Sequence, residues 1–248
     1  MTLLVHAVIR TEDRPFVADE HPSARVVAEP DVAAVVSDVR EQVDESDAPA
    51  HVELLSSLAT SIPALPLTFA TTASDEEAVR SEVLRPGAAT FRQQLEALTD
   101  VVEVRIRVRF DEEASLSAIA QADGEELRRL KQATLAAGAG VAARMSLGEE
   151  IARRMRERQA ASFWALVGPA SDVAERVTVL ECDAQFSVAL LLRRDRLPDM
   201  DGAVATMRGS GGEATDIEYV GPLPPLTFLP ELLDESEPSR DRQSRWGW

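Results

Sequence analysis

Apolar and charged residues alternate strictly in one segment near the middle of the chain. In sequence order the segment reads Val102, Glu103, Val104, Arg105, Ile106, Arg107, Val108 and Arg109. A period of two places successive side chains on opposite faces of a strand. The pattern therefore predicts a β-strand with one apolar face and one solvated face, with the glutamate on the solvated side. The face formed by Arg105, Arg107 and Arg109 is either this solvated sheet face or a face that lies under the helices inserted after the strand.

The rest of the chain contains shorter segments whose apolar residues have the spacing of strands or of helices. Strands are predicted at Leu3–Ile9, Leu65–Phe69, Arg176–Cys182, Gln185–Arg193 and Ala214–Val220, with Asp31–Ser37 either a strand or a strand turning into a helix. Helical spacing of apolar residues predicts helices over about 50–61, 74–98, 112–167 and 195–208, with a break in the third near 137–140. The strands Arg176–Cys182 and Gln185–Arg193 are expected to form a hairpin that turns at Asp183-Ala184. Ser74 with Glu77, and Ser146 with Glu149, have the spacing of capping boxes, so helices are expected to begin there. Pro86-Gly87 is expected to interrupt the helix that follows Ser74.

The order of these elements predicts the fold class and the domain organisation. From Val101 onward the order is strand, helices, strand, strand, helix, strand, which is the split βαβ or ferredoxin-like order. We predict an α+β protein of two domains. The predicted parts are an N-terminal α+β domain at 1–99, a modified ferredoxin-like domain at 100–230 with a helical insertion at about 112–167, and a polar C-terminal tail at 231–248.

Composition narrows the classes of partner. The chain has 248 residues, 45% of them apolar, which is enough for a packed core. Its formal net charge of −17 would repel nucleic acid and anionic membranes, so we predict neither as a partner. No apolar run approaches the roughly 20 residues that a membrane helix needs, and the start of the chain reads as a strand and not as a signal peptide. With Cys182 as its single cysteine the chain has no intrachain disulfide, so we expect a cytoplasmic protein.

Residue patterns typical of catalysis, metal binding or cofactor binding are missing from the sequence. His6, His21 and His51 are the three histidines, and no pair of them has the spacing of a metal site. The glycines around Ser210 fit neither a nucleophile elbow nor a phosphate-binding loop. We therefore predict no catalytic residue, no metal and no cofactor, and interpret the acidic clusters as solvated helix starts.

One block departs from the acidic character of the chain. Residues 124–158 hold eight basic residues against five acidic ones, and four of the arginines crowd the predicted helix over 146–165. Ion pairs at i,i+3 and i,i+4 within that helix explain the pattern without a partner. A docking surface for an acidic partner is the alternative.

A proline-dense segment lies close to the end of the chain. It reads Gly221-Pro222-Leu223-Pro224-Pro225-Leu226-Thr227-Phe228. Three prolines in this run cannot continue a helix or occupy the middle of a sheet, so the segment is expected to lie extended against other parts of the protein. A rigid strap that packs on its own domain is the simplest interpretation.

Several motifs, taken in order, resemble those of the gas vesicle protein F/L family. Residues 65–71 are similar to the family pattern Leu-Pro-Leu-Arg-Phe-Gly-Thr, and residues 221–228 to Gly-Pro-Trp-Pro-Pro-Tyr-Ser-Phe. The family's early Asp-Leu-Ala-Ala-Val-Val-Ser segment, its His-led helix and its Glu-led strand resemble 31–37, the helix from His51 and the strand from Glu103. The chain departs from the family at Thr68, Ala70, Leu223 and Leu226, where the family has Arg, Gly and two bulky aromatics. The matching motif residues, structural or partner-binding, are Pro66, Phe69, Thr71, Glu103, Gly221, Pro222, Pro224, Pro225 and Phe228.

The resemblance implies a function that the residues alone do not. It implies an accessory or minor structural protein of gas vesicles, located at the vesicle in the cytoplasm and acting in nucleation or assembly of the gas-filled shell. Its partners would be the small hydrophobic shell subunit and other gas vesicle accessory proteins, and it would carry out no enzymatic step. A small-molecule-binding regulatory module on a ferredoxin-like scaffold is the alternative.

Overall fold

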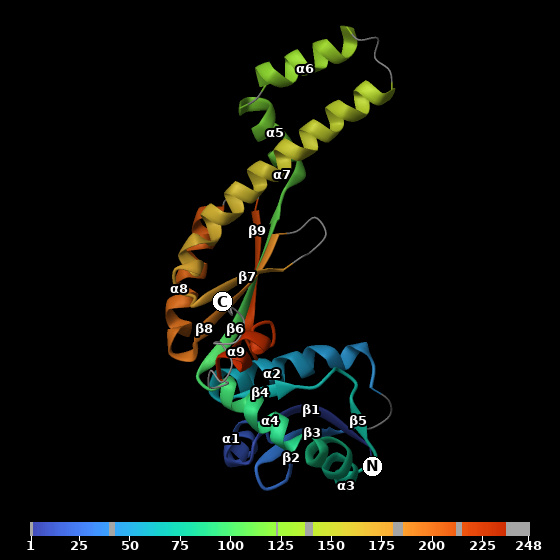
Figure 1. Ribbon diagram of the computed structural model, residues 1–248, viewed down its shortest axis with the longest axis vertical. Helices are drawn as coiled ribbons and strands as arrows, with labels where there is room; N and C mark the ends of the chain where they lie inside the picture. Colours follow the sequence, from blue (N-terminus) through green and yellow to red (C-terminus); the bar gives the residue numbers. More distant parts are fainter. Residues whose placement is uncertain are drawn as a thin grey trace, which may run out of the picture. The chain divides into compact units, whose positions relative to one another are not determined.

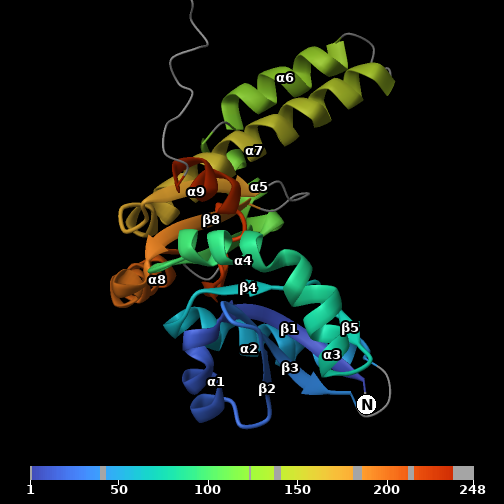
Figure 2. The same ribbon diagram turned by 60° about the horizontal axis from the view of Figure 1, so that its bottom comes forward.

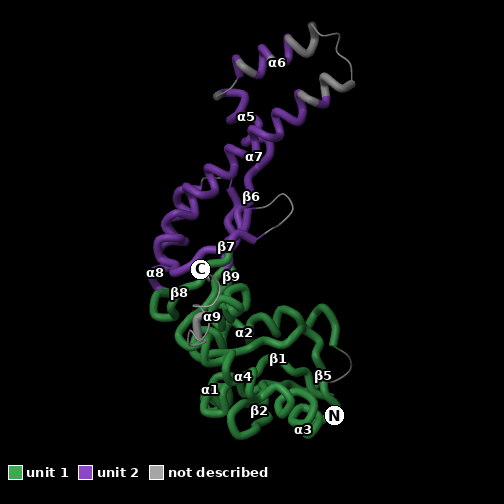
Figure 3. Tube along the Cα trace, viewed as in Figure 1, with its two compact units in different colours: residues 1–104, 189–197, 220–248 green, residues 105–188, 198–219 purple. Residues whose placement is uncertain are grey.

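The structure is a computed structural model that describes residues 2–39, 43–122, 124–136, 141–180, 186–211 and 215–236. The chain forms two compact units (Figure 3). The first unit comprises residues 1–104, 189–197 and 220–248, and the second comprises 105–188 and 198–219. The domain boundary between residues 99 and 100 stays a prediction, but two later segments, 189–197 and 220 onward, belong to the first compact unit.

The first unit is built on a mixed arrangement of strands and helices (Figures 1 and 2). Its elements in chain order are β1 (Leu3–Arg10), α1 (Arg14–Glu20), β2 (Arg25–Ala28), β3 (Val32–Asp38), α2 (Ala48–Ser61), β4 (Ala64–Pro66), β5 (Thr72–Ala73), α3 (Glu76–Ala78) and α4 (Arg85–Ala97). The strands lie in the order β2-β3-β1-β4, with β5 also paired to β1. With α1 and α2 as the crossovers, this is again a split βαβ order, which the sequence did not reveal for this half.

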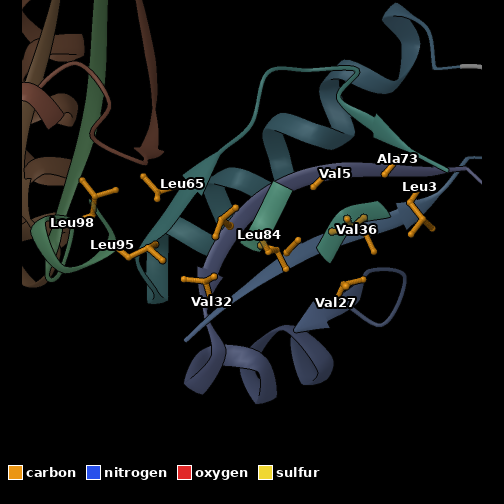
Figure 4. Packing of buried hydrophobic residues seen from close by; sticks show 13 residues of the cluster. Leu3, Val5, Val27, Val32, Val36, Leu65, Ala73, Leu84, Leu95 and Leu98 are labelled. Carbon is orange, nitrogen blue, oxygen red and sulfur yellow. The ribbon is translucent and has the colours of Figure 1, made fainter. Parts of the chain in front are cut away.

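Each face of the first sheet carries its own apolar core. Val32, Ala34 and Val36 of β3 point into a cluster that also contains Leu84, Leu95 and Leu98 (Figure 4). The alternate residues of β3, Ala33 and Val35, pack with Leu55 and Leu58 of α2. A strand buried on both faces reads as a continuous apolar run, which is why residues 32–36 show no polar alternation.

The second sheet confirms the predicted ferredoxin-like order. Its strands are β6 (Val101–Phe110), β7 (Arg176–Leu180), β8 (Phe186–Arg193) and β9 (Thr215–Leu223), arranged β7-β8-β6-β9. Between β6 and β7 lie the helices α5 (Glu112–Ala122), α6 (Gly124–Ala136) and α7 (Val141–Ser171), and α8 (Leu197–Gly211) connects β8 to β9. The predicted α+β fold class, with a helical insertion in the ferredoxin-like part, is confirmed. The predicted break at 137–140 and the hairpin turn at 183–184 lie outside the described residues.

Three predicted helix boundaries were wrong. The helix cap near residue 74 is Asp75, whose Oδ1 accepts a hydrogen bond from the Ala78 nitrogen at 2.9 Å. Pro86 does not interrupt the helix. A π-helical turn at Val79–Leu84 directly precedes α4 and changes the backbone hydrogen-bond pattern there, so the missing N–H of the proline falls in the first turn of α4, where proline is tolerated. Helix α7 begins at Val141, so Ser146 lies inside it and is not a cap.

The C-terminal part of the described chain packs into the first unit. Helix α9 (Leu229–Ser236) occupies the first residues of the region predicted as a polar tail. Its Leu229 and Leu232 lie against the same apolar cluster as Leu84 and Leu95. The predicted tail therefore starts with a docked helix, and residues 237–248 lie outside the described residues.

Candidate functional site

Glu103 is the centre of a buried cluster of motif residues. Its side chain is 0% exposed, so the prediction that it lies on a solvated face of β6 was wrong. One carboxylate oxygen accepts a hydrogen bond from the Thr227 nitrogen at 3.0 Å, and the other accepts one from the Thr227 hydroxyl at 2.9 Å. A buried carboxylate requires such donors, because an uncompensated charge in an apolar interior is strongly unfavourable.

The arginines of β6 follow the predicted pattern more closely. Arg105 and Arg109 are exposed and Arg107 is half-buried. Arg107 pairs with Glu218 of β9 at 2.8 Å, and Arg109 pairs with Asp216 of the same strand. This face of the second sheet is therefore solvated and lined with cross-strand ion pairs.

Gly221 and Pro222 lie inside β9, where a strand ending at Val220 was predicted. Pro222 is tolerated because β9 is an edge strand of its sheet. Gly221 has a φ of +151°, and a Cβ built there would lie 2.8 Å from Cγ1 of Val104 and 3.1 Å from its Cα. The backbone of β9 therefore approaches β6 more closely at this point than any other residue type allows.

Residues 224–228 form a compact turn that leads into α9. Pro224, Pro225 and Phe228 are buried, and Phe228 is 0% exposed. The Leu226 nitrogen donates to the Pro224 oxygen at 2.8 Å, and the Phe228 nitrogen donates to the Pro225 oxygen at 3.2 Å. Leu226, at the tip of this turn, is 42% exposed. The proline-dense segment is thus a docked strap with a single apolar side chain presented to solvent.

The other motif, residues 65–71, lies in the same unit. Pro66 pairs with Ala7 of β1, and the Thr71 oxygen accepts a hydrogen bond from the Val5 nitrogen at 2.8 Å. The Thr71 nitrogen and hydroxyl both donate to the Thr68 oxygen, at 3.0 and 2.6 Å, and so close a tight turn. Ala70 in this turn has a φ of 68°, in the left-handed region that favours glycine. All nine predicted motif residues therefore belong to the first unit.

The three histidines, scattered in the sequence, line one cavity of about 520 Å³ in the first unit. His6 is the extra residue of a bulge in β1, between Val5 paired to Val36 and Ala7 paired to Val35. Its Nδ1 lies 2.9 Å from Nδ1 of His51, and its Nε2 lies 2.8 Å from the Ser37 hydroxyl. His21 lies 3.0 Å from the Ser57 hydroxyl through its Nε2.

The electrostatics of this cavity keep the paired imidazoles neutral. Burial, with the neighbouring His51 charge as a second cause, lowers the pKa of His6 from 6.5 to about 4. Burial also lowers the pKa of His51. A hydrogen bond between two Nδ1 atoms needs one donor and one acceptor, so both rings cannot be protonated in this geometry. Phe69 contacts the His51 ring with centroids 5.4 Å apart, which links the cavity to the motif at 65–71.

Neither cluster displays the arrangement of a known metal site. In the part of the chain that the structure describes, no group of three or more His, Cys, Asp or Glu side chains is placed to hold a metal ion. Within the same residues, no helix combines the length and the apolar character needed to cross a bilayer. Cys182 lies outside the described residues.

Sequence reasoning missed three contributors to these clusters. Thr227 supplies both donors to Glu103, and Leu229 and Leu232 anchor α9, yet all three lie more than 120 residues from their partners in β6 or the first core. The alternation of β6 does not indicate that Glu103 is buried, because an acidic residue between two valines is the ordinary pattern of a strand with one solvated face.

The fold and the motif cluster define an α+β protein with two sheets and a C-terminal strap built into its first unit. The family model for the gas vesicle synthesis protein GvpL/GvpF matches residues 3–230 of this chain. A curated relative, gas vesicle protein F of Streptomyces sp. (strain CB03234), is 30% identical over 221 residues, which is 86% of this chain and 90% of the relative. The chain belongs to the GvpL/GvpF family, as the motif resemblance indicated.

Solved structures agree with this assignment at the level of the fold. The crystal structure of GvpF from Anabaena sp. PCC7120 superimposes with a TM-score of 0.71 at 14% sequence identity, over 92% of this chain and 98% of that one. GvpF from Microcystis aeruginosa gives a TM-score of 0.70 at 15% identity with the same coverage. Family membership assigns the protein a gas-vesicle-related role.

Proposed function

We propose that this protein is an accessory or minor structural protein that acts in nucleation or assembly of the gas vesicle shell. It would bind the small hydrophobic shell subunit, work with other gas vesicle accessory proteins in the cytoplasm or at the vesicle, and carry out no enzymatic step. The observation that carries the proposal is the match of the GvpL/GvpF model over residues 3–230, that is, through the strap.

Physical considerations support this assignment. A subunit whose assembled form keeps water out of the shell must expose apolar surface before it assembles, and such surface leads to aggregation. A partner with a net charge of −17 remains soluble when it covers that surface. Binding of this kind requires a surface, not a catalytic site.

The exposure of the strap residues supports one of them as the contact with a partner. Pro224, Pro225 and Phe228 are buried, so they stabilise the first unit and are not available to a partner. Leu226 is 42% exposed at the tip of the turn, where the family has a bulky aromatic residue. We propose that Leu226 is the motif position that contacts the shell subunit, because it is the exposed apolar side chain of the strap and can cover apolar surface of a partner.

Co-purification of the full chain with the shell subunit of the same host tests this function. Wild type should retain the subunit in solution, and Leu226→Ser should reduce the retained amount. Leu116→Ser is a matched control, because Leu116 in α5 is also a leucine that is 42% exposed. Failure of wild type to retain the subunit would reject shell-subunit binding, whereas equal loss in both variants would reject the assignment to Leu226.

The alternative, a small-molecule-binding module on the ferredoxin-like scaffold, has its own support. A cavity of about 340 Å³ lies in the second unit, at the low end of the range that ligand pockets occupy. Stabilisation of the chain by a small molecule in the absence of any shell subunit would favour this function.

A further inference from the structure

The histidine cavity of the first unit has a negatively charged lining. Glu20, Asp47 and Glu53 contribute carboxylates to its wall, and no arginine or lysine is among the described residues that line it. Glu20 and Glu53 are exposed and form no ion pair or hydrogen bond with other described residues. Two negative charges of the wall are therefore uncompensated within the described chain, which favours a cation in this cavity over an anion.

One ring nitrogen of His51 is available inside the same cavity. Only 5% of the His51 surface is exposed and the ring belongs to the cavity lining, so the exposed part of the ring faces the cavity. Its Nδ1 is used by His6, whereas its Nε2 has no hydrogen-bond partner among the described residues. A polar atom of a nearly buried side chain needs a partner, and here the cavity is where that partner can lie.

The hydrogen bonds behind His51 allow this nitrogen to act as an acceptor. If Nδ1 of His51 donates to Nδ1 of His6, then His6 donates from its Nε2 to the Ser37 hydroxyl, which is 2.8 Å away. The lone pair on Nε2 of His51 is then left for a donor in the cavity. Burial lowers the pKa of both His6 and His51, so neither ring carries a charge at neutral pH that would repel a cation.

The rest of the lining distinguishes between classes of cation. Hard metal ions such as Mg²⁺ take oxygen ligands, and among the described residues no group of three or more His, Cys, Asp or Glu side chains is placed to hold a metal ion. An ammonium group donates three hydrogen bonds, so it can use an imidazole nitrogen and carboxylate oxygens together. Apolar surface for a short methylene chain comes from Leu4, Ala24, Ala50 and Leu54.

We propose that the histidine cavity binds a short aliphatic diamine, with one ammonium donating to Nε2 of His51 and the other beside the carboxylates of Glu20 and Glu53. The methylene chain between them lies along Leu54. The cavity volume of about 520 Å³ is within the range of ligand pockets and accommodates 1,4-diaminobutane. Every residue of the lining belongs to the first unit, so the site is distinct from the cavity of the second unit. It goes beyond the proposed role with the shell subunit.

The test uses the full chain with 1,4-diaminobutane as the probe, at neutral pH and constant ionic strength. Calorimetric titration should show saturable binding, and thermal unfolding should shift upward with the diamine concentration. Butane-1,4-diol has the same chain length without the charges, and it should bind at least about tenfold more weakly. Butan-1-amine should bind about threefold more weakly than the diamine, because it loses one exposed ion pair.

Nitrogen-15 resonances of the imidazole rings report the contact with His51 directly. With the diamine bound, Nε2 of His51 should have the chemical shift of an unprotonated nitrogen, and the resonance should saturate at the same diamine concentration as the calorimetric signal. Mg²⁺ has the same charge as the diamine but no N–H group. It should leave this resonance unchanged, which separates a specific contact from general attraction to an acidic protein.

Two variants and a matched control locate the site. Glu53→Gln should weaken diamine binding by about threefold, the effect of one exposed ion pair. Glu82→Gln is the control, because Glu82 is also exposed in the first unit but does not line the cavity, and it should bind the diamine like wild type. Ala50→Trp replaces an exposed lining residue with a large side chain that fills the cavity, and it should abolish binding while circular dichroism remains unchanged.

Each contrary result overturns a stated part of the inference. Absence of saturable diamine binding to wild type rejects the site, and equal binding of the diol rejects the requirement for an ammonium group. A protonated Nε2 of His51 in the complex, or a shift of its resonance with Mg²⁺, rejects the contact between ammonium and ring. Binding that survives Ala50→Trp, or equal loss in Glu53→Gln and Glu82→Gln, rejects the location. None of these measurements involves a shell subunit, so their failure leaves the proposed function in gas vesicle assembly unaffected.

Discussion

Ala70 occupies a backbone conformation that glycine adopts more easily, and this makes Ala70→Gly a stabilising substitution. Ala70 has a φ of 68° in the turn that Thr71 closes onto Thr68. The family pattern has glycine at this position, and the present chain departs from it. The left-handed conformation costs an L-residue about 1–2 kcal/mol. Glycine avoids that cost but loses about 0.5–1 kcal/mol through the greater freedom of the unfolded chain.

The difference between these two costs lies between about 0 and 1.5 kcal/mol, so Ala70→Gly should raise the free energy of unfolding by about 0.75 kcal/mol. The turn itself should not change, because its hydrogen bonds run between Thr68 and Thr71 and from Val5 to Thr71. Urea denaturation followed by far-ultraviolet circular dichroism at constant pH measures the shift of the midpoint. An unchanged m-value would show that the shift reflects stability.

The matched control is Ala89→Gly, at an exposed position inside helix α4. Here the same chemical change occurs in regular helix, where glycine destabilises by about 1 kcal/mol relative to alanine. The two variants should therefore shift the midpoint in opposite directions. A decrease in stability for both would refute the reasoning, because it would mean that the turn at Ala70 carries no strain for glycine to relieve.

Three further predictions concern the motif cluster and the histidine cavity. Gly221→Ala should lower the free energy of unfolding by about 3 kcal/mol, because the new Cβ would lie 2.8 Å from Cγ1 of Val104. Denaturant midpoints measure this loss, and an unchanged midpoint would contradict the close approach of the two strands. Glu103→Gln should lower the free energy of unfolding by about 1 kcal/mol and Glu103→Ala by about 3 kcal/mol, because glutamine keeps an oxygen that accepts a hydrogen bond from Thr227 and alanine does not. Equal losses in the two variants would argue against these hydrogen bonds. The pKa of His6 is lowered from 6.5 to about 4, so between these values the unfolded chain binds a proton at His6 and the folded chain does not. The free energy of unfolding should therefore be at its full value above about pH 6.5 and fall by up to about 3 kcal/mol as the pH drops toward 4. His6→Gln should flatten the pH dependence of the unfolding free energy in that window, and an unaltered slope would contradict the assignment to His6.

The local periodicity of the sequence was sufficient to predict the second sheet. The period of two in β6 and the helices and strands after it are each visible in short stretches of neighbouring residues. The observed arrangement β7-β8-β6-β9 is the one expected for that order of elements. The first sheet has the same split βαβ order, but β4 is only Ala64–Pro66 and β3 is apolar on both faces. Short strands and buried strands give weak period-two signals, which is why this half was predicted only as α+β.

The candidate site could be predicted only in part, for a different physical reason. The motif residues were found by resemblance, but the burial of Glu103 depends on Thr227, a partner 124 residues away. Likewise His6 and His51 come together because a bulge in β1 redirects one side chain toward α2. Contacts over such separations are set by the tertiary fold, and the spacing of three histidines in a sequence contains no information about them.

The place of the strap in the first unit determines how its function can be tested. Truncation before Gly221 would remove Phe228, which is 0% exposed, together with Leu229 and Leu232, which lie against the core of the first sheet. It would also leave the Glu103 carboxylate without the donors of Thr227 in an apolar interior. A truncated chain that fails to retain the shell subunit would thus report loss of the first unit as readily as loss of a binding surface. Only a substitution that leaves this core intact, such as Leu226→Ser at the exposed tip, separates the two effects.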